Sequence, residues 1–211
     1  AGKTGEPFEI GIATVDITPP LGVAMAGYGP RKGVAESVGH PLRAEALVCR
    51  DGKDAWALVT SDVIGYPVER VRAEAAGRTG LAPEAILISG THTHSGPAAM
   101  RVYKSELTDV DHRYRENLEK KLAELVANAW EACEPGHFEV ARAEAPDLAS
   151  NRRVVADDGT ATNEWVDAEG KHTGYYDPSV LLVGVARPGG RRDALLVNYG
   201  CHPVTLGPRS L

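Results

Sequence analysis

The chain is poor in the features that mark several large classes of protein. Its three cysteines in 211 residues lie far apart, which excludes a disulfide framework of the kind that holds small secreted domains together. No apolar stretch approaches the roughly 20 residues that a transmembrane helix needs, so we expect no transmembrane segment. The formal net charge is -6 without long runs of either sign. The basic surface of a nucleic-acid-binding protein is missing, and we expect no nucleic-acid partner.

The cysteines are better explained by packing than by chemistry. Cys49 lies in an apolar strand pattern and Cys133 on the apolar side of a predicted helix, which favours buried thiols. Cys201 stands next to His202, but adjacent residues of an extended segment point to opposite faces. This argues against Cys201 as a second ligand beside that histidine.

What is present is an ordinary globular composition, with 43% hydrophobic and 25% charged residues. Several near-continuous apolar segments alternate with helical ones, which predicts buried strands and an α/β fold with mixed β-sheets and helices packed on the outer faces. We expect residues 1–211 to belong to one domain. The predicted strands cover residues 11–17, 44–50, 55–60, 85–88, 180–186 and 194–199. Residues 146–178 show no sustained periodicity, which is typical of a disordered segment or a functional lid.

Two helices are predicted, over residues 68–79 and, most clearly, over residues 111–133. In the second, apolar residues recur at spacings of three and four with charged residues between them, and Pro135-Gly136 is expected to end it. This pattern predicts a surface helix that covers a sheet. His112 near its start and His137 beyond its end are expected to lie in solvent.

Two histidines follow predicted strands directly. His92 comes after the apolar run at residues 85–88, and His202 after the run at residues 194–199, both with glycine nearby. Imidazole is the commonest metal ligand, and strand ends are where α/β proteins place their chemistry. His92 and His202 are therefore the candidate metal ligands; the alternative is two buried, hydrogen-bonded core histidines.

Two further residues, His94 and Asp62, are open to two interpretations. His94 would share a face with His92 in an extended segment, whereas Gly90 and Ser95–Pro97 predict a turn, so the spacing leaves open whether His94 is a ligand or a structural partner. Asp62, at a strand end, either orients a ligand histidine or caps a turn. Asp16 is expected to form a turn.

Five segments resemble the N-terminal part of the neutral/alkaline (non-lysosomal) ceramidase family and occur along the chain in the order found in that family. The most specific segment is Thr91–Pro97, which reads THTHSGP. The less specific segments are Gly11–Pro20, Met25–Gly29, Asn151–Arg153 and Cys201–Pro203. The resemblance runs from about residue 10 to the last residue.

The resemblance implies a catalytic Zn²⁺ site with His92 and His202 among its ligands. It also implies that His94 contacts the substrate and the catalytic network, and that Arg152 lies near the substrate. The alternative for Arg152 is a solvated loop arginine. Gly27-Tyr28 matches a family motif beside the active site, although its glycine also suits a turn. In the family a glutamate, a tyrosine and a proposed serine nucleophile come from further downstream.

These implications predict a metal-dependent amidohydrolase that cleaves an N-acyl, ceramide-like bond with a zinc-activated water. Because two ligands are fewer than a catalytic zinc site uses, we expect a C-terminal remainder or a second chain to complete the site. The alternatives are a metal-dependent esterase or small-molecule amidase on the same scaffold, or a non-catalytic metal- or ligand-binding subunit. Residues 1–7 lack both Met and the apolar core of a signal peptide. This start agrees with a cytoplasmic protein and with one secreted after removal of a leader.

Overall fold

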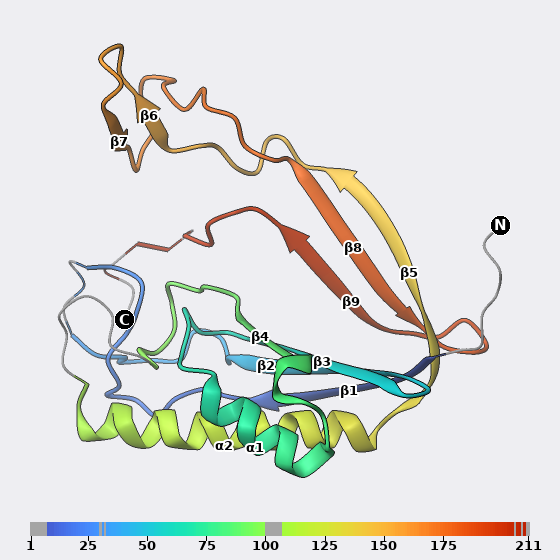
Figure 1. Cartoon of the computed structure of the whole chain (residues 1–211). Helices are drawn as coiled ribbons and strands as arrows, with labels where there is room; N and C mark the ends of the chain where they lie inside the picture. Colours follow the sequence, from blue (N-terminus) through green and yellow to red (C-terminus); the bar gives the residue numbers. More distant parts are fainter. Residues whose placement is uncertain are drawn as a thin grey trace. The chain divides into compact units, whose positions relative to one another are not determined.

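The computed structural model describes residues 8–29, 31, 33–99, 107–204, 206, 207 and 209. The chain divides into two compact units. The first comprises Ala1–His137, Arg187–Arg191 and Pro203–Leu211, and the second Phe138–Ala186 and Arg192–His202. Strands and helices are mixed along the chain, which confirms the predicted α/β class (Figure 1).

The first unit is built on a mixed sheet with the strand order β4-β3-β2-β1-β5. Its first four strands are β1 (Phe8–Asp16), β2 (Arg43–Asp51), β3 (Asp54–Ser61) and β4 (Ile86–Gly90). β2 runs antiparallel to β1 and β3, as the predicted hairpin requires, whereas β4 runs parallel to β3 and places Gly90 opposite Ser61. Parallel strands end at the same edge of a sheet, so the segments after Ser61 and Gly90 leave the sheet side by side.

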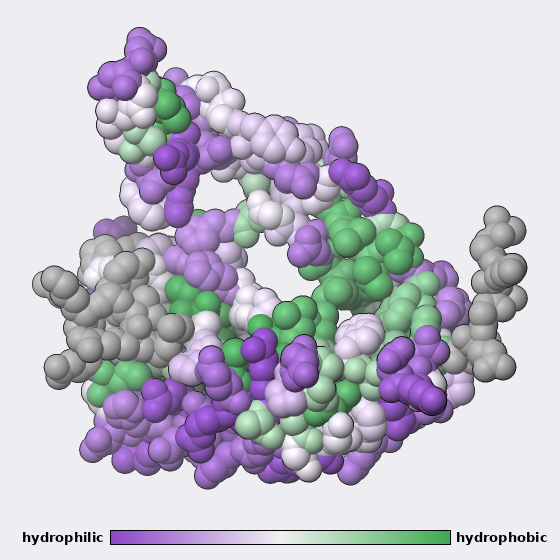
Figure 2. Space-filling view, viewed as in Figure 1, coloured by the Kyte–Doolittle hydropathy of each residue, from purple (hydrophilic) through white to green (hydrophobic). Residues whose placement is uncertain are grey.

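Two helices cover one face of this sheet (Figure 1). They are α1 (Glu69–Thr79) and α2 (Asp109–Glu131), with the short 3₁₀ helix η1 (Pro83–Ala85) leading into β4. α2 packs on β1 and β2, and hydrophilic residues predominate along the lower edge in Figure 2, over α2. Among the described residues, no helix is long and apolar enough to cross a membrane.

The apolar face of α2 is the one predicted from its periodicity. Its fully buried side chains include Leu118, Leu122, Leu125 and Val126. The helix approaches β1 very closely at Gly11, where an added Cβ would lie 1.7 Å from the carbonyl oxygen of Ala129. Only glycine leaves room for this contact between helix and sheet.

The prediction that Pro135 and Gly136 end α2 was wrong. The helix ends at Glu131, and Pro135 and Gly136 lie inside β5 (Glu134–Glu144), where they pair with Glu9 and Phe8 of β1. Proline is tolerated there because it is only the second residue of the strand, where a missing N–H interrupts little of the ladder. The Pro-Gly pair therefore marks the entry into a strand that the sequence did not predict.

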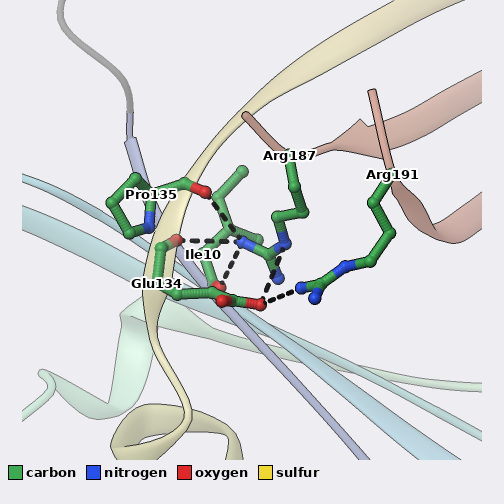
Figure 3. Close-up of polar contacts among 5 residues, drawn as sticks. All are labelled: Ile10, Glu134, Pro135, Arg187 and Arg191. Carbon is green, nitrogen blue, oxygen red and sulfur yellow. Dashed lines mark hydrogen bonds and ion pairs between the residues drawn. The ribbon is translucent and has the colours of Figure 1, made fainter. Parts of the chain in front are cut away.

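A buried arginine fixes the start of β5. Arg187 is 4% exposed, and its Nη1 donates to the carbonyl oxygens of Ile10 and Glu134, both at 2.9 Å (Figure 3). Its Nε lies 3.4 Å from the Glu134 carboxylate, to which Arg191 also donates. The buried cation is thus both paired and hydrogen-bonded, as its desolvation requires.

The second unit holds the rest of β5 and the hairpin of β8 (Ser179–Ala186) and β9 (Arg192–Tyr199), in the order β5-β8-β9. The hairpin was predicted. The short antiparallel pair β6 (Arg153–Val155) and β7 (Ala161–Asn163) was not, because its residues are largely exposed and carry no apolar alternation. Residues 146–178 are therefore partly ordered.

Candidate active site

The THTHSGP segment leaves the sheet directly after β4. The N–H of Thr91 donates to the carbonyl of Ser61 at 2.8 Å, and that of His92 to the carbonyl of Val63 at 3.1 Å. The motif therefore runs beside the residues that follow β3. His92 has a φ of 61°, a left-handed conformation that few residues other than glycine adopt. Such strain collects at functional sites, where the surrounding structure holds it in place.

The orientation of the exposed His92 ring suits a metal ligand. Its Nδ1 lies 3.2 Å from the carbonyl oxygen of Ile64. Because a carbonyl only accepts, Nδ1 is the donor, and the lone pair of the neutral ring belongs to Nε2. A carbonyl on one ring nitrogen is the usual arrangement for a histidine that binds a metal through the other.

His94 lies beside His92 but is buried, with 6% of its surface exposed. The two ring centroids are 5.2 Å apart and the rings meet at 64°. The ring of Tyr28 makes a T-shaped contact with His94, with a centroid distance of 4.9 Å and an interplanar angle of 76°. The two histidines of the motif and Tyr28 thus form one cluster.

A pairing between two loops brings Tyr28 to this cluster. The N–H of Ala26 donates to the carbonyl of Gly96 at 3.0 Å, and that of Ala98 to the carbonyl of Ala24 at 2.8 Å. The carboxylate of Asp111, in the first turn of α2, accepts from the N–H of Ala24 at 2.8 Å. Sequence reasoning singled out Tyr28 only through the family motif.

Asp62 and Asp16 both take part in local backbone structure. Asp62 accepts from the N–H of Arg43 at 3.0 Å and from the hydroxyl of Thr91 at 3.2 Å, which supports the turn-capping interpretation. Asp16 accepts from the N–H of Thr18 at 2.7 Å, and the hydrogen bonds from Thr18 hold the pKa of its carboxyl below the ordinary value. Asp16 is the turn former that the sequence predicted.

The second unit brings together Arg152 and His202. Nη1 of Arg152 lies 3.2 Å from Nδ1 of the half-buried His202. The guanidinium carbon of Arg152 lies 4.2 Å from the ring centroid of Trp165, a cation–π contact. Sequence reasoning missed Trp165; the available signal was a tryptophan in a segment with no apolar periodicity.

Among the described residues, the cysteines take no visible part in either cluster through a hydrogen bond to a histidine ring, although the Sγ of Cys201 lies 3.7 Å from the carbonyl oxygen of His202. Cys49 is buried, and burial raises the pKa of its thiol. Cys133 is only partly buried, just beyond the end of α2, and Cys201 is exposed with its Sγ 3.8 Å from the carbonyl of Leu148. His112 and His137 are exposed, as expected.

A cavity of about 470 Å³ lies against the motif within the first unit. Thr93, Ser95, Gly96 and Pro97 form one of its walls. The remaining lining is mainly apolar and comprises Thr18, Pro19, Leu21, Val23, Met25, Ala35, Ser37, Val38, Gly39, His40, Leu42 and Leu206. The motif thus borders an apolar cavity.

Comparison with known proteins supports the resemblance read from the motifs. Residues 8–209 match the family described as neutral/alkaline non-lysosomal ceramidase, N-terminal. Neutral ceramidase A of Dictyostelium discoideum is 23% identical over 206 residues, which cover 92% of this chain and 28% of that protein. The neutral ceramidase of Drosophila pseudoobscura pseudoobscura is 29% identical over 109 residues, or 48% of this chain and 16% of that protein.

The fold is shared with a solved structure. The crystal structure of neutral ceramidase from Pseudomonas aeruginosa superimposes with a TM-score of 0.76 at 16% identity, over 97% of this chain and 33% of that one. This chain thus spans about a third or less of the length of these relatives. With nearly all of its length matched, the chain belongs to the neutral/alkaline non-lysosomal ceramidase family and corresponds to its N-terminal region.

Proposed function

We propose that this chain supplies the N-terminal part of the active site of a metal-dependent hydrolase that cleaves the amide bond of an N-acyl lipid such as ceramide. The observation that carries the proposal is the His92 ring, whose Nδ1 is bonded to the Ile64 carbonyl in a chain of the ceramidase family. The relatives named above are called neutral ceramidases, and their reaction is the one we transfer.

In this proposal His92 and His202 are two ligands of a Zn²⁺ ion. When bound, the ion would polarise the scissile carbonyl and lower the pKa of a water molecule. Catalytic zinc sites use three protein ligands, so we propose that the remaining ligands lie outside residues 1–211. The Nε2 of His92 has a lone pair that can bind the ion directly. His202 can bind the ion after Arg152 has moved away from its Nδ1.

The other two residues act on the substrate. His94, held between neighbouring rings and shielded from solvent, would hydrogen-bond the substrate and hold a proton for the departing amine. Arg152 would use its planar set of donors to stabilise negative charge on the carbonyl oxygen or to bind the polar head group. Both roles need fixed geometry, and each side chain has an aromatic neighbour that supplies it.

The lining of the cavity beside the motif supports a substrate with an apolar acyl group. Among the described residues that line it, His40 is the one titratable side chain. A cavity with so little charge favours a hydrocarbon chain over a charged metabolite. We therefore propose that the substrate carries an alkyl chain next to the amide.

Hydrolysis by the complete protein tests this function. We would compare an N-acyl sphingoid base, an ester of the same chain length and a short N-acetyl amide, each with and without a chelator. The expected result is metal-dependent release of fatty acid from the first substrate, well above the other two. Preferential cleavage of the ester or of the short amide would replace the proposal by the esterase or small-molecule amidase, and metal binding without any turnover would indicate a binding subunit.

A further inference from the structure

We propose that Gly27 and Tyr28 are positioning residues for His94, so that the active conformation of its ring depends on a loop remote from it in sequence. The proposal rests on the proposed function, in which His94 acts on the substrate. Tyr28 meets the ring edge-on at 4.9 Å, while Gly27 lies directly against the ring. Together they restrict the positions that the His94 side chain can take.

The His94 ring leaves no room for a side chain at position 27. A Cβ at this position would lie 2.5 Å from Cγ and 2.7 Å from Nδ1 of His94, closer than real Cβ atoms approach other heavy atoms. The φ of Gly27 is 105°, a conformation that a side chain disfavours in any case. Any other residue must therefore displace the ring or the loop.

Tyr28 is itself held from two sides. The guanidinium of Arg31 lies 4.9 Å from its ring centroid, and Nη1 of Arg31 donates to the carbonyl of Ala26 at 2.7 Å. The hydroxyl of Tyr28 donates to the carbonyl of Leu206. A ring fixed in this way transmits its position to His94 by packing, because tightly packed side chains have no room to move independently.

The loop is also tied to the rigid part of the first unit. The pairing of Ala24 and Ala26 with the end of the motif fixes its register, and the Asp111 carboxylate, 1% exposed, holds Ala24 to the start of α2. These contacts mean that Gly27 cannot retreat easily when a side chain is added. The His94 ring is therefore the group that must shift.

The test compares Gly27→Ala with Gly22→Ala in the complete protein. Gly22 has a φ of 90°, and an added Cβ there meets nothing within 4 Å, so it reproduces the backbone strain without the clash. We expect Gly27→Ala to shift the His94 imidazole resonances in a long-range ¹H–¹⁵N spectrum and to lower kcat by about 10²-fold with metal content retained, as a displacement of about 1 Å can do. Gly22→Ala should leave both unchanged.

Tyr28 is tested by two substitutions. Tyr28→Phe keeps the ring and its contact with Arg31 but loses the bond to Leu206, so it should change the His94 resonances and kcat less than Tyr28→Leu. Tyr28→Leu should change both strongly, with a smaller effect on KM. In a His94→Ala background, Gly27→Ala should lower turnover no further. Equal effects of Gly27→Ala and Gly22→Ala on His94 and on kcat would overturn the proposal. Shifted resonances in a protein that cleaves no N-acyl substrate would instead overturn the proposed function and leave the positioning intact.

Discussion

Nη1 of Arg152 donates to Nδ1 of His202 across 3.2 Å. Because a guanidinium has no acceptor, this bond uses the Nδ1 lone pair, and the hydrogen of the neutral His202 ring lies on Nε2. A metal ion needs a lone pair on one of these nitrogens, and binding at either one breaks the bond to Arg152. In the proposed site, metal binding by His202 would therefore require the release of Arg152.

The first prediction follows from this competition. Arg152→Ala should bind the metal at least as tightly as the unsubstituted protein, because His202 no longer has a rival donor. Its turnover of an N-acyl substrate should nevertheless fall by about 10²-fold or more, through loss of a positioned charge. Metal affinity is measured by competition with a chelator, and kcat is measured on the metal-loaded protein.

The neighbouring arginine is the control for this substitution. Arg153 is exposed and lies in β6, so Arg153→Ala should change neither quantity. Weaker metal binding in Arg152→Ala than in the unsubstituted protein would show that the arginine supports the ligand and does not compete with it.

The elements predicted correctly were those whose own residues carry the signal. α2 buries a stripe that repeats at helical spacing, and the β2–β3 hairpin turns at Asp51-Gly52, a strong turn pair. In β5 only Gly136 is buried, so the strand has no pattern of buried hydrophobic residues from which it could be predicted. Its pairing with β1 depends on residues far away in the sequence.

The site divides in the same way. The sequence singles out His92 as a candidate ligand because glycine and a strand end are next to it. The contact of Gly27 with His94 arises from the pairing of Met25 with Pro97, and that of Trp165 with Arg152 from the path of an irregular segment. Local spacing contains neither of these long-range contacts.

A second prediction concerns stability at high pH. Burial raises the pKa of Tyr66, which is 8% exposed, to about 12, above the value of roughly 10 in an unfolded chain. Between these values the unfolded state loses its proton first, so this contribution is present below about pH 10 and is lost as pH rises toward 12. Two pH units correspond to about 3 kcal/mol.

Urea unfolding at pH 8 and at pH 11, midway between the two pKa values, measures about half of this loss. Tyr66→Phe cannot ionise and should lose less stability between the two pH values than the unsubstituted protein. Tyr175→Phe is the control, because Tyr175 is 84% exposed. An identical pH dependence in Tyr66→Phe and the unsubstituted protein would contradict the assignment.

A third prediction compares a buried and an exposed arginine. Arg187→Ala should lower the free energy of unfolding by about 2–4 kcal/mol, because the carbonyls of Ile10 and Glu134 lose a charged donor. Arg192, whose side chain is 68% exposed and paired with Glu139, should contribute far less, because solvent screens an exposed ion pair. Equal losses in Arg187→Ala and Arg192→Ala, measured by chemical unfolding, would mean that the buried network does not stabilise the start of β5.

In the proposed site, His92 and His202 bind the metal whereas His94 serves the substrate. The most direct test of this assignment is the metal content of the His92→Ala, His202→Ala and His94→Ala variants of the complete protein, followed by the kcat of any variant that retains metal. We predict near-zero metal in the first two, and full metal with turnover reduced by about 10²-fold or more in His94→Ala. Loss of metal from His94→Ala to the same extent as from His92→Ala, or full metal in either His92→Ala or His202→Ala, would contradict the account.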